Sequence, residues 1–224
     1  PRALASESLL AMVLPLTHSS KAGTAWSLSA NWFVEVSCQS SELIFMDLPA
    51  QIAEVREKRG RDHGLQPGEW FVTKHSNLQC IHVVFHLVVD ATPVEEELSE
   101  PVLQGLSEVI EVAGEHDVCG LVLPSILSEA RIDLAEPSGA VEEKKGSRFG
   151  MGWILASADT SDSDHKPSAQ EKGVMARSAA VLRTLRDTVK GARHLETIHL
   201  LAPSRYVGAQ TVNVARTLCR LEVL

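Results

Sequence analysis

The stretch LSEPVLQGLSEVIEVAGEHDVCGLVLP, residues 98–124, decides the fold class. Its first part places apolar residues at every third or fourth position with acidic residues opposite, which predicts an amphipathic helix. The apolar positions are Leu98, Val102, Leu106, Val109, Ile110 and Ala113. Its second part, Val118 to Leu123, is a short apolar run typical of a strand buried on both faces. A helix leading directly into a buried strand predicts a largely parallel sheet.

Further strands are expected on both sides of this unit. Ile81 to Val89 is nearly continuous in apolar and β-branched residues, which predicts a central strand. The segment from Leu9 to Leu14, stopped by Pro15, is expected to be a buried strand or a short helix. The other predicted strands are Trp32–Ser37, Glu69–Thr73 after the Pro67–Gly68 turn, Gly152–Leu155 and Ile198–Ala202.

Three more segments have helical periodicity. Leu48, Ile52 and Val55 share one face of a helix that Asp47 can cap and that is expected to end at Gly60. A second helix is expected over 174–189 and a last one over 207–221, although 220–224 could instead form a strand. Strands alternating with helices predict an α/β protein, with three α/β/α layers around a mixed, largely parallel sheet.

Residues 1–224 are expected to form one domain with two polar insertions. The segments 128–148 and 157–173 contain few apolar residues, so we expect them to be mobile. The chain opens with Pro1 rather than Met, which suggests a processed form or a fragment of a longer protein.

Composition excludes several classes of protein. The 224 residues are 44% hydrophobic and contain no apolar run of 18 residues, so no membrane span is expected. The net charge of −8 argues against a general nucleic-acid binder. Four scattered cysteines without a Cys-x-x-Cys pair predict reduced thiols in an intracellular protein, cytoplasmic or nuclear.

Motifs for catalysis or metal binding are weak. His82 and His86 would lie about 13 Å apart on a strand, too far to share one ion, and His75 is expected to be a solvated loop residue. Ser125 follows a buried strand but lacks the flanking glycines of a Gly-x-Ser-x-Gly elbow. The dinucleotide and P-loop glycine patterns are also missing, so no cofactor and no metal site is predicted.

The stretch QPGEWFVTKHSNLQCIHVV, residues 66–84, resembles part of a macro domain. In that family a Pro-Gly-acid turn leads into a short strand ending in Thr. An Asn-Leu pair follows, and then a central strand that begins with an apolar residue and His. The resemblance continues through the helix and strand of residues 98–126 and covers roughly Trp32 to Ala202. It implies a macro-like fold and, in family members that bind it, an ADP-ribose pocket.

The two loops that hold the diphosphate in such macro domains differ in this chain. The first, residues 38–43, reads CQSSEL and lacks the expected Asn and glycines. The second, residues 125–129, reads SILSE where Gly-x-Gly is expected. Side chains in place of glycine should obstruct the backbone approach to a diphosphate, and Glu42 and Glu129 should add repulsion. We therefore interpret the ligand site as degenerate.

The leading hypothesis is a non-catalytic protein-interaction module, part of a larger intracellular protein or complex, with a protein partner. The alternative is a divergent ADP-ribose or nucleotide binder, or an ADP-ribosyl hydrolase. Its pocket would be lined by Ser40, Ser41, Ser125 and Tyr206, the tyrosine being placed to stack on a base or ribose. A third hypothesis is an unrelated hydrolase that uses Ser125 with one of the histidines.

Overall fold

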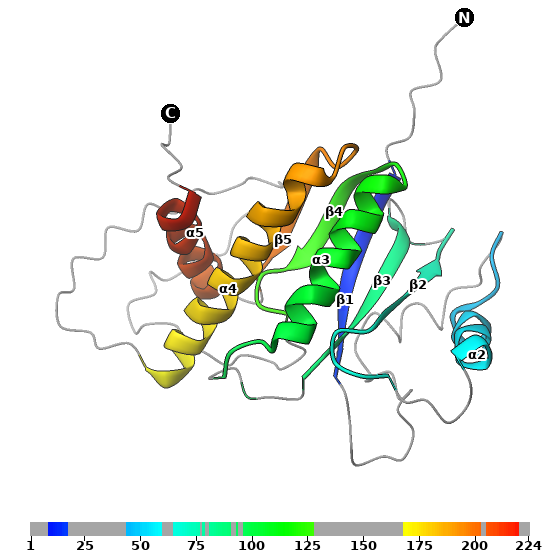
Figure 1. Ribbon diagram of the computed structural model, residues 1–224, viewed down its shortest axis with the longest axis horizontal. Helices are drawn as coiled ribbons and strands as arrows, with labels where there is room; N and C mark the ends of the chain where they lie inside the picture. The colour runs from blue at the N-terminus through cyan, green and yellow to red at the C-terminus, as the bar shows by residue number, and fades with distance from the viewer. Residues whose placement is uncertain are drawn as a thin grey trace, which may run out of the picture.

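The structure is a computed structural model that describes residues 9–17, 44–59, 65–76, 78, 81–90, 93, 96–127, 168–202 and 205–219 (Figure 1). Strands and helices alternate along most of these ranges. In chain order they are β1 (Leu9–Thr17), α2 (Leu48–Arg59), β2 (Trp70–Lys74), β3 (Ile81–Val89), α3 (Glu100–Glu115), β4 (Val118–Pro124), α4 (Ala169–Thr188), the short 3₁₀ helix η1 (Val189–Gly191), β5 (Thr197–Leu201) and α5 (Arg205–Cys219).

The described strands form one sheet in the order β2-β3-β1-β4-β5. β1 pairs in parallel with β3 and with β4, and β4 pairs in parallel with β5. Among the described strands, β2 alone runs antiparallel to its neighbour, β3. The predicted mixed, largely parallel sheet is therefore confirmed, and β1, the first of the described strands, lies at its centre.

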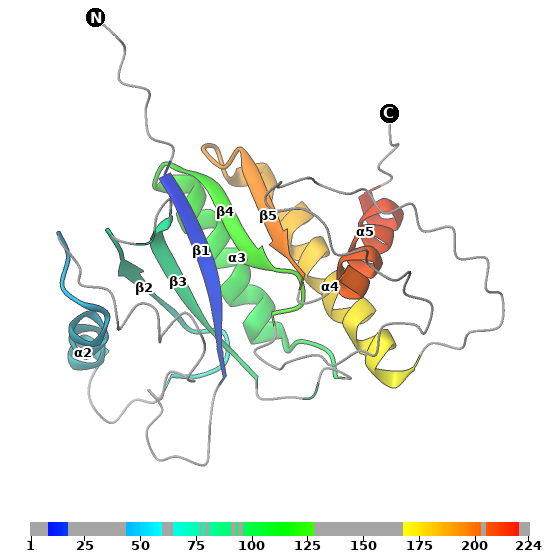
Figure 2. The same cartoon turned by 180° about the vertical axis from the view of Figure 1, so that it is seen from behind.

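Helices lie on both sides of this sheet. α3 and α4 lie side by side over one face, and the view from behind shows them beyond the strands (Figures 1 and 2). Ala11, Phe85, Leu121 and Leu106 belong to the single apolar cluster that this face forms with the two helices. On the other face, α2 packs through Ile52 and Val55 on a separate cluster that includes Phe71 and Val88. The three-layer α/β/α class is confirmed.

β1 extends further than its sequence suggested. Pro15 was expected to stop the segment, yet the strand continues through it to Thr17. β1 pairs with β4 only as far as Met12, whereas its pairing with β3 runs to Thr17. Pro15 is tolerated because the ladder on the β4 side has already ended, so its missing N–H breaks no bond there.

α4 also begins earlier than expected. The predicted insertion 157–173 ends too late, because Ala169 already starts the helix. Ser168 and Glu171 form a reciprocal capping box: the Ser168 Oγ accepts from the Glu171 N–H at 3.2 Å, and the Glu171 carboxylate accepts from the Ser168 N–H. This pair satisfies the first N–H groups of the helix and fixes its start among polar residues.

α2 attaches to the outer edge of β2 mainly through polar groups. Asp47 caps the helix as expected, since its Oδ1 accepts from the Ala50 N–H at 2.9 Å. The side-chain amide of Gln51 donates to the Lys74 carbonyl and accepts from the Lys74 N–H, each at 2.8 Å. Arg59 donates to the Trp70 carbonyl at 3.0 Å. These contacts occupy backbone groups that an edge strand would otherwise leave open.

The predicted Pro67–Gly68 turn lies directly against α3. Gly68 has φ +89°, in the left-handed region that favours glycine. A Cβ on Gly105 would lie 2.1 Å from the Gly68 carbonyl oxygen, and a Cβ on Gly68 would lie 2.2 Å from that of Pro101. Both glycines are therefore needed for the turn to approach the helix.

Some expectations fall outside the described residues. These are the strands Trp32–Ser37 and Gly152–Leu155, the insertion 128–148 and most of the insertion 157–173. That residues 1–224 form a single domain stays a prediction.

Candidate functional site

Ser125 follows β4, at the end of the sheet where the parallel strands finish. Its N–H donates to the Leu201 carbonyl of β5 at 2.8 Å, and its side chain is only 1% exposed. Within the described part of the chain its Oγ has no hydrogen-bond partner. A nucleophilic serine needs a base within hydrogen-bond reach. The described residues supply none, so the hydrolase hypothesis lacks its catalytic pair there.

The two residues after Ser125 point into the protein. Ile126 is 2% exposed and packs with Val174 of α4 and Val207 of α5. Leu127 is fully buried in the main apolar cluster and takes φ 46°, a left-handed conformation that costs a leucine about 1 kcal/mol. The turn after β4 is thus closed by packed apolar side chains, where phosphate-binding turns present glycine backbone.

The remaining residues of the predicted pocket are placed only in part. Ser40 and Ser41 lie outside the described residues. Tyr206 lies in the first turn of α5, but its side chain is not described. Its neighbour Val207 contacts Ile126, the neighbour of Ser125, so these two stretches of chain lie close together. A ligand pocket formed by the four residues stays a prediction.

A buried polar cluster lies between β2 and β3. Thr73 Oγ1 is 2.8 Å from His75 Nε2 and 2.7 Å from His86 Nε2. A hydroxyl has one proton to donate, so it donates to one ring and accepts the N–H of the other. His75 is 1% exposed, so its prediction as a solvated loop residue is wrong. The hydrogen bond with the Thr73 hydroxyl keeps the His75 ring buried. The position of His75 in the sequence, just after β2, did not indicate this burial.

His86 is fully buried, and its ring stacks on Phe71 with centroids 4.5 Å apart. Burial, with a smaller contribution from the nearby His75, lowers the pKa of His86 from 6.5 to about 3. The imidazole is therefore neutral at ordinary pH. The cluster links the two strands through hydrogen bonds. Because it is enclosed, a substrate cannot reach either imidazole.

His82 and His86 both lie on β3, as expected. Across the residues that the structure describes, no three His, Cys, Asp or Glu side chains gather to hold a metal ion.

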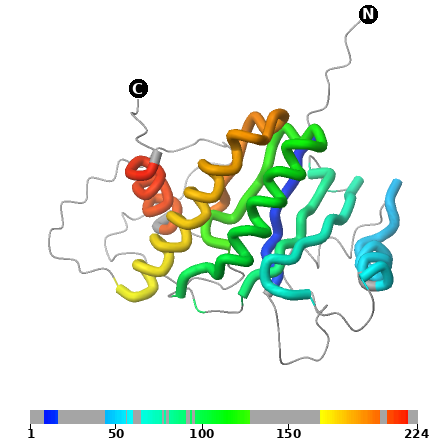
Figure 3. Tube along the Cα trace, in the orientation of Figure 1, coloured from blue at the N-terminus to red at the C-terminus, as the bar shows by residue number. Residues whose placement is uncertain are grey.

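An open groove lies between α3 and α4, on the side of the helices away from the sheet. Its volume is about 490 Å³. Figure 3 shows the two helices side by side and running in the same direction. The groove is lined by Glu97, Leu98, Glu100, Leu103, Gln104 and Ser107 on the α3 side and by Ala176, Ala179, Ala180, Arg183, Thr184, Asp187 and Thr188 on α4.

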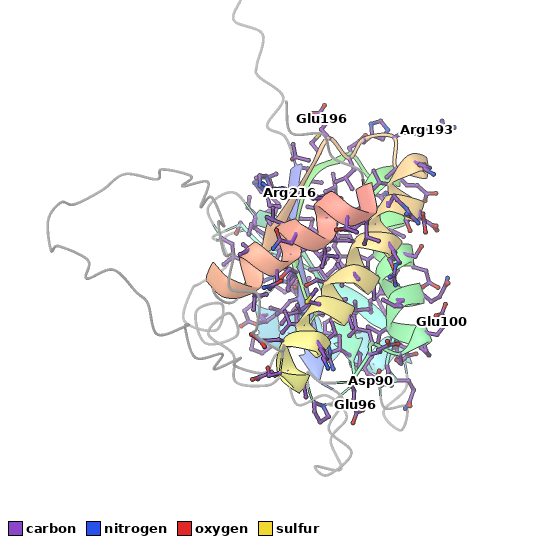
Figure 4. All side chains as sticks on the ribbon, turned by 90° about the vertical axis from the view of Figure 1, so that its left-hand side faces the viewer. Asp90, Glu96, Glu100, Arg193, Glu196 and Arg216 are labelled. Atoms are coloured by element: carbon purple, nitrogen blue, oxygen red, sulfur yellow. The ribbon has the colours of Figure 1, made fainter. Side chains whose placement is uncertain are left out.

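Acidic side chains stand at one end of this groove. Glu97 and Glu100 are exposed, and Figure 4 shows Glu100 at the same end of the molecule as Asp90 and Glu96. Arg193 lies at the opposite end (Figure 4). Farther along the groove, the guanidinium of Arg186 donates to the Asp187 carboxylate at 2.9 Å and lowers the pKa of Asp187, which keeps it ionised.

Sequence reasoning did not find the groove. The acidic side of α3 is visible in its helical pattern, and the alanines of α4 follow the same period. The pattern does not reveal that α4 packs beside α3, because the order of the strands in the sheet decides which helices are adjacent.

None of the helices within the described ranges combines the length and the apolarity required to cross a bilayer.

Two comparisons with known sequences find similarity in the middle of the chain. The profile of the family described as "Ferry endosomal RAB5 effector complex subunit 3" matches residues 57–136. Curated proteins named FERRY endosomal RAB5 effector complex subunit 3 from Rattus norvegicus and Mus musculus are 38% identical over 63 residues. That match covers 27% of this chain and 11% of either relative, so it spans a small part of their length.

Similar solved structures extend over nearly the whole chain. A mutant macrodomain of Oceanobacillus iheyensis solved with ADPR superposes with a TM-score of 0.56 at 11% identity, covering 96% of this chain and 88% of that one. The same macrodomain with ADP gives 0.53 at 13% identity, covering 95% and 86%. The fold is macro-domain-like. The resemblance inferred from residues 66–84 is thereby confirmed at the level of fold.

Proposed function

We propose that this chain is a protein-interaction domain with a macro-like fold that serves as part of a multi-subunit complex. The observation that carries the proposal is the profile match across residues 57–136, which spans β2, β3, α3 and β4. The relatives are named as subunits of an endosomal RAB5 effector complex. By analogy, the chain would act on the cytoplasmic side of endosomes rather than in the nucleus.

The geometry supports a binding role over catalysis. The turn after β4 is closed by Ile126 and Leu127, and Ser125 has no base beside it in the described residues. The histidines of the Thr73 cluster are buried. A groove with room for another molecule lies open between α3 and α4. An open groove between two helices can accept a helix of another protein.

Co-purification tests the proposal. The tagged chain, expressed in cells of its source organism, is purified and its mass is measured by light scattering, with its companions identified by mass spectrometry. We expect stoichiometric companion subunits and recovery on endosomes that carry active RAB5. A chain that elutes as a monomer without a stoichiometric companion would contradict the proposal.

A second arm addresses the nucleotide alternative. Calorimetry and thermal unfolding are run with ADP-ribose at about 1 mM, a concentration at which even weak specific binding is detectable. We expect no heat of binding and no shift of Tm. Saturable heat with a raised Tm would favour the divergent ADP-ribose binder instead.

A further inference from the structure

We propose that the groove between α3 and α4 is the docking site for a short basic amphipathic helix of a partner protein. The helix would lay an apolar face on the groove and place Lys or Arg near Glu97 and Glu100. The inference rests on the proposed function, because it assigns the surface and the partner chemistry of the interaction domain.

The dimensions and lining of the groove suit a helix. The lining residues on α4 extend from Ala176 to Thr188, twelve residue steps, or about 18 Å at 1.5 Å per residue. This length matches a helix of three turns. Three alanines of α4 and Leu103 of α3 line the groove, and small side chains let a third helix approach to the usual packing distance.

Polar contacts near both ends of the groove fix the position of α4. At one end, the buried Arg177 donates from Nε to the Glu96 carbonyl at 2.8 Å and from Nη2 to the Pro93 carbonyl at 2.7 Å. At the other end, the hydroxyls of Ser107 and Thr188 lie 2.9 Å apart. α4 is thus tied to α3 and to the segment before it, so little ordering is needed when a partner binds.

Charge favours a basic partner. The lining carries three carboxylates, Glu97, Glu100 and Asp187, and one guanidinium, Arg183. Asp187 is already paired with Arg186, so the charge argument rests on Glu97 and Glu100. Among the described residues, Glu97 and Glu100 form no ion pair of their own. An acidic peptide or a nucleic acid would be repelled at this end, whereas Lys or Arg would be attracted.

Helix stability does not explain the acidic side of α3. Glu100 lies in the first turn, where a carboxylate complements the helix dipole. The exposed Glu111 and Glu115 lie near the other end, where the dipole disfavours them, and the last turn carries no basic residue. Glu111 and Glu115 lie beyond the α3 residues that line the groove, so of these three carboxylates only Glu100 bears on the proposed site.

The experiment uses an 18-residue amidated peptide of Leu, Ala and Lys, with apolar residues at heptad positions a and d. An isomer with Glu in place of Lys serves as the control peptide. Binding to the whole chain is measured by calorimetry. Glu97→Lys with Glu100→Lys should weaken binding of the Lys peptide about tenfold, because two attractive charges become repulsive. The Glu peptide should not bind the natural chain.

Two matched variants make the test specific. Glu111→Lys with Glu115→Lys makes the same change of charge farther along α3, beyond the last α3 residue that lines the groove. It should alter affinity less than about threefold, since these positions are farther away and screened by salt. Ala180→Trp places a bulky ring in the groove and should abolish binding while thermal unfolding shows that the fold is kept.

The remaining outcomes overturn the inference. Equal losses for the two charge-reversal pairs would indicate general attraction to an acidic surface. No binding of the Lys peptide would remove the site. If the natural chain forms a dimer and Glu97→Lys with Glu100→Lys dissociates it, the groove binds a second copy of the chain instead. If companion subunits still co-purify in these cases, the proposed function stands and only the docking site is refuted. If the natural chain recovers no companion subunits, the proposed function itself is refuted.

Discussion

The two faces of the sheet are covered by different means. On one face, α3 and α4 bury a continuous apolar cluster that takes alternate residues from β1, β3 and β4. On the other face, the apolar residues divide into smaller clusters, and Thr73, His75 and His86 take core positions beside them. There α2 is attached by the hydrogen bonds of Gln51 and Arg59 to the edge of β2.

This difference separates two properties. Apolar burial is insensitive to pH, whereas a buried neutral imidazole makes the free energy of unfolding depend on pH. We therefore expect the face under α3 and α4, with its continuous apolar cluster, to supply most of the stability and a rigid support for the groove. We expect the face near α2, through His86, to make the stability depend on pH. Three variants test this difference between the two faces. The largest effect is expected on the face covered by α3 and α4.

Leu106→Ala should cause the largest loss. Leu106 is fully buried in the cluster between α3 and the sheet, so its truncation leaves a cavity in rigid surroundings. We expect the free energy of unfolding to fall by about 3 kcal/mol. Urea unfolding measures it, and Val212→Ala, on the exposed side of α5, is the control with little change. A loss for Leu106→Ala no larger than that of the control would contradict a dominant α3 face.

The second prediction concerns pH and His86. Because the folded-state pKa is lowered from 6.5 to about 3, the folded protein keeps His86 neutral while the unfolded chain takes up a proton below pH 6.5. Stability from this group is present above pH 6.5 and is lost as pH falls toward 3. Between pH 7 and pH 5 the loss should be about 2 kcal/mol, at roughly 1.4 kcal/mol per pH unit below 6.5.

His86→Gln should flatten this dependence, because glutamine can still meet the Thr73 hydroxyl but does not titrate. The control is His199→Gln, which replaces an exposed histidine on β5 and should leave the slope as it is. Urea unfolding at several pH values measures both. An unchanged slope in His86→Gln would show that the pH dependence arises elsewhere.

The elements that could be predicted from the sequence are those whose residue pattern directly reflects their burial. β3 is apolar almost throughout because it is covered on both faces, and α3 has a regular apolar stripe because one side packs on the sheet. β1 was less certain, since its place at the centre of the sheet and the tolerance of Pro15 depend on where β4 stops pairing. Long-range pairing of that kind leaves no local pattern.

The candidate site shows the same limit. The missing glycines of residues 125–129 predicted side chains that obstruct a diphosphate, and this stays a prediction; the structure shows that Ile126 and Leu127 are buried. The burial of His75 was missed because one hydrogen bond from Thr73 decides it. The groove was missed because two helices far apart in sequence form it, and only the sheet order brings them together.

The smallest effect is expected for Gln51→Ala, at the polar attachment of α2. The amide of Gln51 pairs with both backbone groups of Lys74, as a neighbouring strand would. Lys74 is exposed, so water can replace these bonds, and the free energy of local opening should fall by about 1 kcal/mol. Hydrogen exchange of the Lys74 N–H measures it, while Asn213→Ala on α5 should leave that N–H unchanged. If exchange at Lys74 stays as slow as in the natural chain, apolar contacts of Ile52 and Val55 hold α2 in place, and the two faces differ less than their contacts indicate.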